Sequence, residues 1–187
     1  MAQEITPSHF ESVLLCPKHQ GEEPWGFVVL PLEVSEKLPR RGRTSIEGTV
    51  NGHAFTSTLE PDGNKSHWLR IDQALMQAAG ITFGDALHFD IQAVAQEPEP
   101  EVPEDMLEAL QAVPEAWETW LDTTTLARVD WVHWATSAKQ AKTRTKRIHD
   151  ACDMLSSGKK KVCCFDPSGY YSKAFKAPQA VEPSLKI

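Results

Sequence analysis

A short stretch of alternating proline and glutamate near the middle of this 187-residue chain limits how the chain can fold. Residues 96–103 read QEPEPEVP. Proline removes backbone donors and neighbouring glutamates repel one another, so this composition favours an extended linker over a helix or a core strand. We therefore expect two parts, residues 8–95 and residues 104–160, joined by an acidic linker at 96–103 and followed by a tail at 161–187.

The first part has the pattern of a small β-structure. Asn51-Gly52 separates two β-like runs, and this dipeptide is a strong hairpin signal because both turn residues take positive φ. Two stretches share the order strand, short helix, turn and strand; they begin FVVLPLEVSEKL and HWLRIDQALMQAAG. Neither stretch can bury its apolar face alone. We expect them to close into a pseudo-two-fold small β-barrel with short capping helices.

The second part has helical periodicity. Pro103, followed by two acidic residues, is a favourable start for a first helix. A short second helix is expected at 115–121, and a long third helix from about residue 124 to residue 157, with Trp131 and Trp134 on its buried apolar stripe. The predicted fold class is therefore α+β: an N-terminal small β-barrel and a C-terminal module of about three helices. The tail could form a hairpin and is then expected to be disordered.

Charge is distributed unevenly along the chain. The net charge of −7 conceals a balance of −5 over residues 1–95, −9 over 96–137 and +7 over 138–187. A basic end on an acidic protein indicates either an anionic partner or an internal contact with the acidic segment.

The strongest candidate site is the basic face of the expected third helix. Lysines recur there at i, i+3 and i+7, and two arginines at i, i+3 share one side; the set is Lys139, Lys142, Thr143, Arg144, Lys146 and Arg147. Arginine binds phosphates and carboxylates through paired hydrogen bonds, and lysine adds point charge. These residues are predicted to bind an anion: nucleic acid, a phospholipid headgroup or a phosphorylated small molecule. A solvated helix face, or one paired with residues 96–122, is the alternative.

Other chemistry has weaker support in the sequence. Cys16 and His19 have C-x-x-H spacing, but the adjacent Cys163 and Cys164 make a poor pair of zinc ligands, so no metal or other cofactor is expected. Common nucleophile and nucleotide-binding motifs are absent from the sequence. A histidine–carboxylate pair on the barrel remains an open acid–base reading, with His53, His67 and His88 near Glu60 and Asp85. We name no catalytic residue.

The sequence also predicts a cytoplasmic protein. Its acidic N-terminus lacks the pattern of a signal peptide, and no run approaches the roughly 20 apolar residues of a membrane helix. Without an export signal, its four cysteines are expected to be reduced.

Two stretches resemble a known family. The run WVHWATSAKQAKTRTKRI, ending in MLSSGK, resembles the helical module of the YdeI/OmpD-associated, or bacteriocin-protection, family of small bacterial proteins. Residues 9–95 resemble the small β-barrel of unknown function that often precedes this module, of the double-split kind seen in transcription regulators. The resemblance covers roughly residues 8–160 and concerns architecture more than mechanism.

The resemblance implies a non-enzymatic binding or stress-protection protein, connected with bacteriocin or antimicrobial-peptide resistance. Its partner would be an anionic small molecule, a protein or a membrane headgroup, recognised through the basic helix. Two alternatives stay open: a nucleic-acid-binding regulator, and an enzyme that acts on a small molecule in an unknown reaction.

Overall fold

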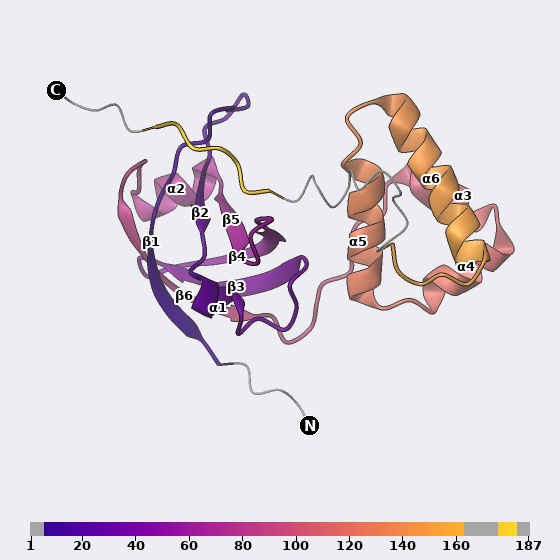
Figure 1. The fold of residues 1–187 in the computed structure, drawn as a ribbon, viewed down its shortest axis with the longest axis horizontal. Helices are drawn as coiled ribbons and strands as arrows, with labels where there is room; N and C mark the ends of the chain where they lie inside the picture. The colour runs from indigo at the N-terminus through magenta and orange to yellow at the C-terminus, as the bar shows by residue number, and fades with distance from the viewer. Residues whose placement is uncertain (1–5, 163–175, 183–187) are drawn as a thin grey trace. The chain divides into compact units, whose positions relative to one another are not determined.

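The computed structural model describes residues 6–162 and 176–182. They form two compact units (Figure 1). The barrel unit contains residues up to 96 together with the C-terminal segment 176–182, and the helical unit begins at Glu97. Each unit has its own hydrophobic core. The predicted α+β fold class is confirmed. The hairpin considered for the tail before residue 176, with Cys163 and Cys164, lies outside the described residues.

Six antiparallel strands and two short helices form the barrel unit. The strands pair in the order β1-β6-β3-β4-β5-β2. The two ends of this order meet at one antiparallel bridge between Leu15 and Phe27, with N–H···O distances of 2.8 and 3.0 Å. The sheet is therefore a nearly closed barrel. The element bounds are β1 Ser8–Val13, β2 Gly26–Val29, α1 Leu32–Ser35, β3 Thr44–Val50, β4 His53–Pro61, β5 His67–Ile71, α2 Gln73–Ala79 and β6 Ala86–Ala93.

Local turn and cap signals set these bounds. Asn51 and Gly52 have φ values of 48° and 82°, and they join β3 to β4 as the predicted hairpin. Helix α2 begins where the Asp72 side chain accepts a hydrogen bond from the Leu75 N–H, and it ends at Gly80 in the left-handed region.

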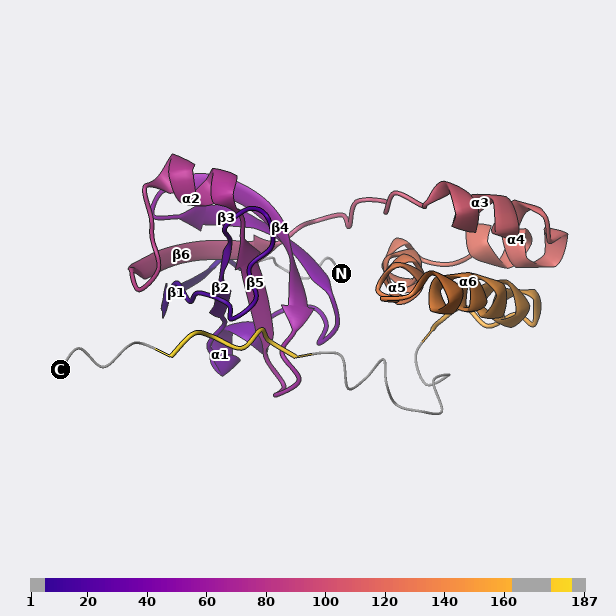
Figure 2. The ribbon, with the colours of Figure 1, turned by 90° about the horizontal axis from the view of Figure 1, so that it is seen from above.

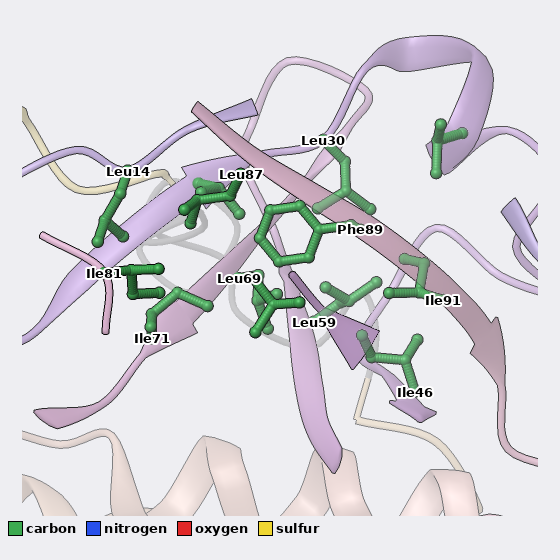
Figure 3. Packing of buried hydrophobic residues seen from close by; sticks show 13 residues of the cluster. Leu14, Leu30, Ile46, Leu59, Leu69, Ile71, Ile81, Leu87, Phe89 and Ile91 are labelled. Carbon is green, nitrogen blue, oxygen red and sulfur yellow. The ribbon is translucent and has the colours of Figure 1, made fainter. Parts of the chain in front are cut away.

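The barrel core follows the two-residue alternation of its strands. On β6, Leu87, Phe89 and Ile91 are at most 1% exposed, whereas His88 and Asp90 between them face solvent. Figure 3 shows Phe89 among the labelled side chains of the barrel core, which come from several strands. Burial of these apolar side chains stabilises the barrel.

Strands β3 and β6 approach closely at Gly48. A Cβ atom here would lie 1.9 Å from the carbonyl oxygen of Asp90 and 2.9 Å from the Cα atom of Ile91. Both neighbours are backbone atoms of a paired strand, so neither can rotate away. Only glycine fits this position without moving β6.

Gly48→Ala is expected to lower the free energy of unfolding by about 2 kcal/mol or more, because β6 must shift to admit the methyl group. Chemical denaturation of the full chain measures the change. Gly21→Ala is the matched control, since a Cβ at Gly21 meets nothing within 4 Å. Equal stability of the two variants would contradict the close approach.

A buried histidine connects α1, β5 and the loop before β3. His67 is 1% exposed; its Nδ1 atom lies 2.6 Å from Ser35 Oγ, and its Nε2 atom lies 2.9 Å from the Gly42 carbonyl oxygen. A carbonyl only accepts, so Nε2 carries the proton and Nδ1 accepts from the serine hydroxyl. Burial lowers the pKa of His67 and the charge of Arg40 adds to this, outweighing the hydrogen bond to Gly42 and the charge of Asp62.

The lowered pKa of His67 predicts a loss of stability in mild acid. The unfolded chain takes up a proton on this residue as the pH falls below about 6.5, while the folded chain resists it, so the free energy of unfolding decreases there. Denaturation from neutral to mildly acidic pH measures this slope, and His67→Gln is expected to flatten it. The same slope in the variant would assign the effect to other groups.

Four helices form the helical unit: α3 Glu104–Gln111, α4 Pro114–Leu121, α5 Thr125–Thr136 and α6 Ala141–Ser156. Figure 2 shows α5 and α6 in one layer, with α3 and α4 in another. The rings of Trp131 and Trp134 pack edge to face, with centroids 6.0 Å apart, and Trp120 joins the same core. The prediction that these tryptophans form the core is confirmed. Among the described helices, none has both the length and the apolar character needed to cross a membrane.

The prediction of one long third helix is wrong. The structure has two helices there, α5 and α6. The Thr136 hydroxyl donates to the Val132 carbonyl at 2.8 Å, and the Ser137 hydroxyl donates to the Trp134 carbonyl at 3.3 Å. These hydroxyls satisfy carbonyl groups at the end of α5. The apolar stripe continues across the break because both helices bury one side in the same core.

Segments expected to be loose also pack on the units. The Glu99 carboxylate, in the predicted linker, accepts two hydrogen bonds of 2.8 Å from Arg128 on α5. Residues 176–182 were expected to be disordered, but Ala180 forms a β-bridge with Pro17 of the barrel. Main-chain pairing, which side-chain composition does not reveal, holds this segment.

Candidate functional site

The six predicted site residues lie on α6 and on the turn that leads into it. The structure gives them three different environments. Arg147 is buried and Arg144 and Thr143 are half-buried, whereas all three lysines are exposed. They therefore do not act as one exposed basic face.

Arg147 points into the helical unit and closes the end of α5. Its Nη1 atom donates to the Trp134 carbonyl oxygen at 2.8 Å and to Ser137 Oγ at 3.2 Å. Its guanidinium carbon lies 5.6 Å from the centroid of the Trp134 ring. With 9% exposure, this arginine binds one carbonyl near the end of α5, that of Trp134, and places its charge at the favourable pole of the helix dipole. Its observed role is structural.

Arg144 is paired with the first turn of α3. Its Nε and Nη2 atoms each donate to one carboxylate oxygen of Asp105, both at 2.9 Å. These hydrogen bonds lower the pKa of Asp105 and raise the pKa of Arg144. The side chains remain 32% and 53% exposed, so an anion from solvent can reach this arginine by replacing Asp105.

Lys146 is paired within its own helix. Its Nζ atom lies 2.5 Å from a carboxylate oxygen of Asp150, at i, i+4 spacing. Thr143 lies one turn before Arg147 and is half-buried. The exposed Lys146–Asp150 pair contributes about 0.3–0.5 kcal/mol to stability, so solvent and ligands compete with it easily.

Lys139 and Lys142 lie where α6 begins. Both are exposed, and within the described ranges neither forms an ion pair. The N-cap residue, Gln140, makes no side-chain cap hydrogen bond, and the first turn of α6 contains no acidic residue. Lysines near the positive pole of a helix dipole are unfavourable without a negative partner. This end of α6 is therefore an electropositive site with open backbone donors.

Three acidic residues of the 96–122 segment are paired with basic residues of the helical unit. Besides Asp105 with Arg144, Glu99 binds Arg128, and Asp122 accepts a hydrogen bond from Lys160. Hydrogen bonds from Thr125 and Arg128 lower the pKa of Glu99, and the hydrogen bond from Lys160 lowers the pKa of Asp122. Part of the charge asymmetry seen in the sequence is thus neutralised by ion pairs inside the unit.

A groove of about 260 Å³ lies between α3 and α6, beside the Arg144–Asp105 pair; its lining includes Asp105, Thr145, His149 and Cys152. Burial, with a smaller contribution from Asp153, raises the pKa of the Cys152 thiol. A neutral thiol is a poor nucleophile and a poor metal ligand. Across residues 6–162 and 176–182, no group of three or more histidine, cysteine or acidic side chains is arranged to hold a metal ion.

The barrel histidines do not form the acid–base pairs considered from the sequence. His67 binds Ser35 and Gly42, Glu60 forms its ion pair with Arg43, and Asp85 accepts from the Thr82 N–H. His88 lies 4.0 Å from Glu11, and both side chains are well exposed. Sequence reasoning missed the Ser35–His67 contact; it allowed a basic helix paired with residues 96–122, which holds for Arg144, but it did not identify Asp105 as the partner. Both contacts join residues more than 30 positions apart, which local spacing cannot show.

The separate roles of the two arginines predict separate effects on stability. Arg147→Ala is expected to lower the free energy of unfolding by about 2–3 kcal/mol, because it removes a buried charged donor to the Trp134 carbonyl and to Ser137 Oγ, together with its contact with the Trp134 ring. Arg144→Ala breaks an exposed ion pair and is expected to cost less than about 1 kcal/mol. Chemical denaturation of both variants tests the difference, and a larger loss for Arg144→Ala would overturn it.

Protein-family comparisons divide the chain where the structure does. Residues 10–91 match the family model of a domain of unknown function, DUF1905. Residues 99–158 match the family model described as bacteriocin-protection, YdeI or OmpD-associated. A comparison with curated proteins finds no match. The two matches fall on the barrel unit and on the helical unit, in the order that the sequence resemblance predicted.

Proposed function

We propose a non-enzymatic binding function in which the helical unit recognises an anionic ligand; this unit holds the match to the family model described as bacteriocin-protection, YdeI or OmpD-associated. The binding site is the start of α6, with Lys139 and Lys142 as the primary contacts. Arg144 and Lys146, on the next turn, serve as secondary contacts.

The observation that carries this proposal is the uncapped, lysine-bearing start of α6. Backbone N–H groups at a helix N-terminus attract anions, and the partial positive charge there adds to that of nearby lysines. Most proteins place Asp, Ser or Thr at such an end. Here, Gln140 makes no cap hydrogen bond and two lysines flank the first turn. A bound anion would satisfy the open donors and offset the repulsion.

Arg144 distinguishes this proposal from a merely solvated helix. Its guanidinium presents a fork to Asp105, the geometry with which arginine binds carboxylates and phosphates. The Asp105 carboxylate thus occupies the position that a ligand anion would take on Arg144. A ligand bound at Lys139 and Lys142 reaches Arg144 by displacing this carboxylate. Arg147 supports the site by fixing the turn between α5 and α6, and Thr143 is half-buried on the first turn of α6.

Nucleic-acid binding and enzymatic activity stay as alternatives. The net charge of −7 weighs against general attraction to nucleic acid. No specific contact in the described residues favours either alternative over anion binding by the helical unit.

The test compares binding of labelled single-stranded DNA, labelled RNA and vesicles containing anionic phospholipid, at low and at moderate salt. Lys139→Ala with Lys142→Ala is expected to weaken binding of the favoured probe by about tenfold, because each lysine near the surface contributes about 1 kcal/mol or less. Asp105→Asn is expected to strengthen binding several-fold, because it frees Arg144.

Lys37→Ala with Lys161→Ala is the matched control, since it removes the same charge from exposed lysines outside the site. Binding that weakens equally in the control and in the α6 double variant would show attraction to total charge only. Binding by none of the three probes at low salt would reject the proposed anion classes.

A further inference from the structure

Residues 177–181 lie on the barrel unit as an extended strand held by main-chain hydrogen bonds. The Lys18 N–H donates to the Gln179 carbonyl, and the Val181 N–H donates to the Cys16 carbonyl, both at 2.8 Å. The Ala177 N–H donates to the Asp62 carbonyl at 3.2 Å. Figures 1 and 2 both show this segment, in yellow, running along the barrel.

The barrel groups that bind this segment lie around the strands β1 and β2, where the barrel is least closed. Cys16 and Lys18 follow β1, just past the bridge between Leu15 and Phe27; among the described residues, this bridge is the main-chain pairing beside β1 and β2, and the Ser12 hydroxyl adds a side-chain hydrogen bond to the Val29 carbonyl. Asp62 follows β4, on the other side of β5 and β2 in the strand order. The segment is thus anchored on both sides of this strand pair, and it satisfies backbone groups that a sheet edge otherwise leaves open.

The hydrogen bonds and the burial of residues 177–181 indicate what kind of peptide this edge can bind. The bonds at Gln179 and Val181 use backbone atoms two residues apart, which is the pattern of a peptide added to a sheet edge. Ala177, Pro178 and Ala180 are half-buried, whereas Gln179 and Val181 are exposed. The edge therefore accommodates alanine or proline at the half-buried positions, whereas the side chains at the exposed positions are unrestricted.

The strands beside this edge carry an aromatic cluster on their outer face. Phe27 pairs with the exposed Arg70 and points away from the core residue Val28, yet it is only 1% exposed. Trp25 and Trp68 lie 6.4 and 6.2 Å from Phe27 by ring centroids, and Arg70 stacks 4.2 Å above Trp25. Aromatic surfaces of this kind favour extended, proline-containing segments.

We propose that the Cys16–Lys18 edge of the barrel is a binding site for an extended, proline-containing peptide with small inward side chains. Residues 177–181 are its built-in occupant, and a partner peptide of the same chemistry binds by displacing them. A few main-chain bonds in one isolated bridge permit this exchange, because the tethered segment is held mainly by its high effective concentration. The site is distinct from the start of α6, so either proposal can fail without the other.

The test uses the full chain, ¹⁵N-labelled, with Val181→Pro to remove the N–H that binds Cys16. A blocked peptide of sequence KAPQAVE, residues 176–182, is then titrated while the Lys18 amide resonance is followed. The peptide is expected to shift this resonance in the variant and to bind the wild type at least about tenfold more weakly, because the tethered segment competes. Ala177→Pro, which removes the bond to Asp62, is expected to act in the same direction.

Glu182→Pro is the matched control, because it adds a proline to the same segment without removing one of these three bonds; it is expected to behave as the wild type. Amide resonances of Leu69 and Phe89 report that the barrel core is intact. A Lys18 resonance that the peptide leaves unmoved in both variants, or equal binding by variants and wild type, would overturn the proposal. Cross-relaxation between Lys18 of one copy and Val181 of another would overturn it too, by making a second copy the occupant.

Discussion

The hydrogen bonds from Arg147 to the end of α5 determine the architecture of the helical unit. The Arg147 guanidinium, on α6, donates hydrogen bonds to the Trp134 carbonyl and to the Ser137 hydroxyl oxygen, and it lies beside the Trp134 ring. A buried charge is tolerated only where such partners surround it. This contact fixes α6 against α5, so it also decides which residues of α6 face solvent. Lys139 and Lys142 lie away from this contact and are exposed.

Some of the charged residues of this unit pair with one another across its segments. The acidic stretch before α5 is held to the helices by three ion pairs, from Glu99, Asp105 and Asp122. Each is partly or well exposed, so each contributes little energy alone. Together they set where the acidic residues lie, and they leave the start of α6 as a place where positive charge has no such counterpart among the described residues. A net charge counted over a segment therefore overstates the charge that a ligand meets.

The barrel unit depends on backbone geometry more than on charge. The close approach at Gly48, the hydrogen-bonded His67 and the single bridge between Leu15 and Phe27 each require a particular arrangement of main-chain atoms. The C-terminal segment, residues 177–181, also depends on main-chain atoms, because main-chain hydrogen bonds hold it at the barrel edge. The proposed sites of the two units therefore differ in kind: that of the helical unit consists of charged groups, whereas that of the barrel unit consists of backbone groups beside aromatic rings.

Local patterns in the sequence determined the α+β class, the Asn51-Gly52 hairpin and the burial of Trp131 and Trp134, because these depend on periodicity and turn chemistry over a few residues. The sequence also located the basic residues of α6, but it could not assign their roles. The break between α5 and α6 was hidden because the apolar stripe continues through it. The partners of Arg144 and Arg147, the Ser35–His67 pair and the docking of residues 177–181 were decided by tertiary structure alone. Each joins groups that are distant in sequence, and only the packing of whole elements brings such groups within hydrogen-bonding distance.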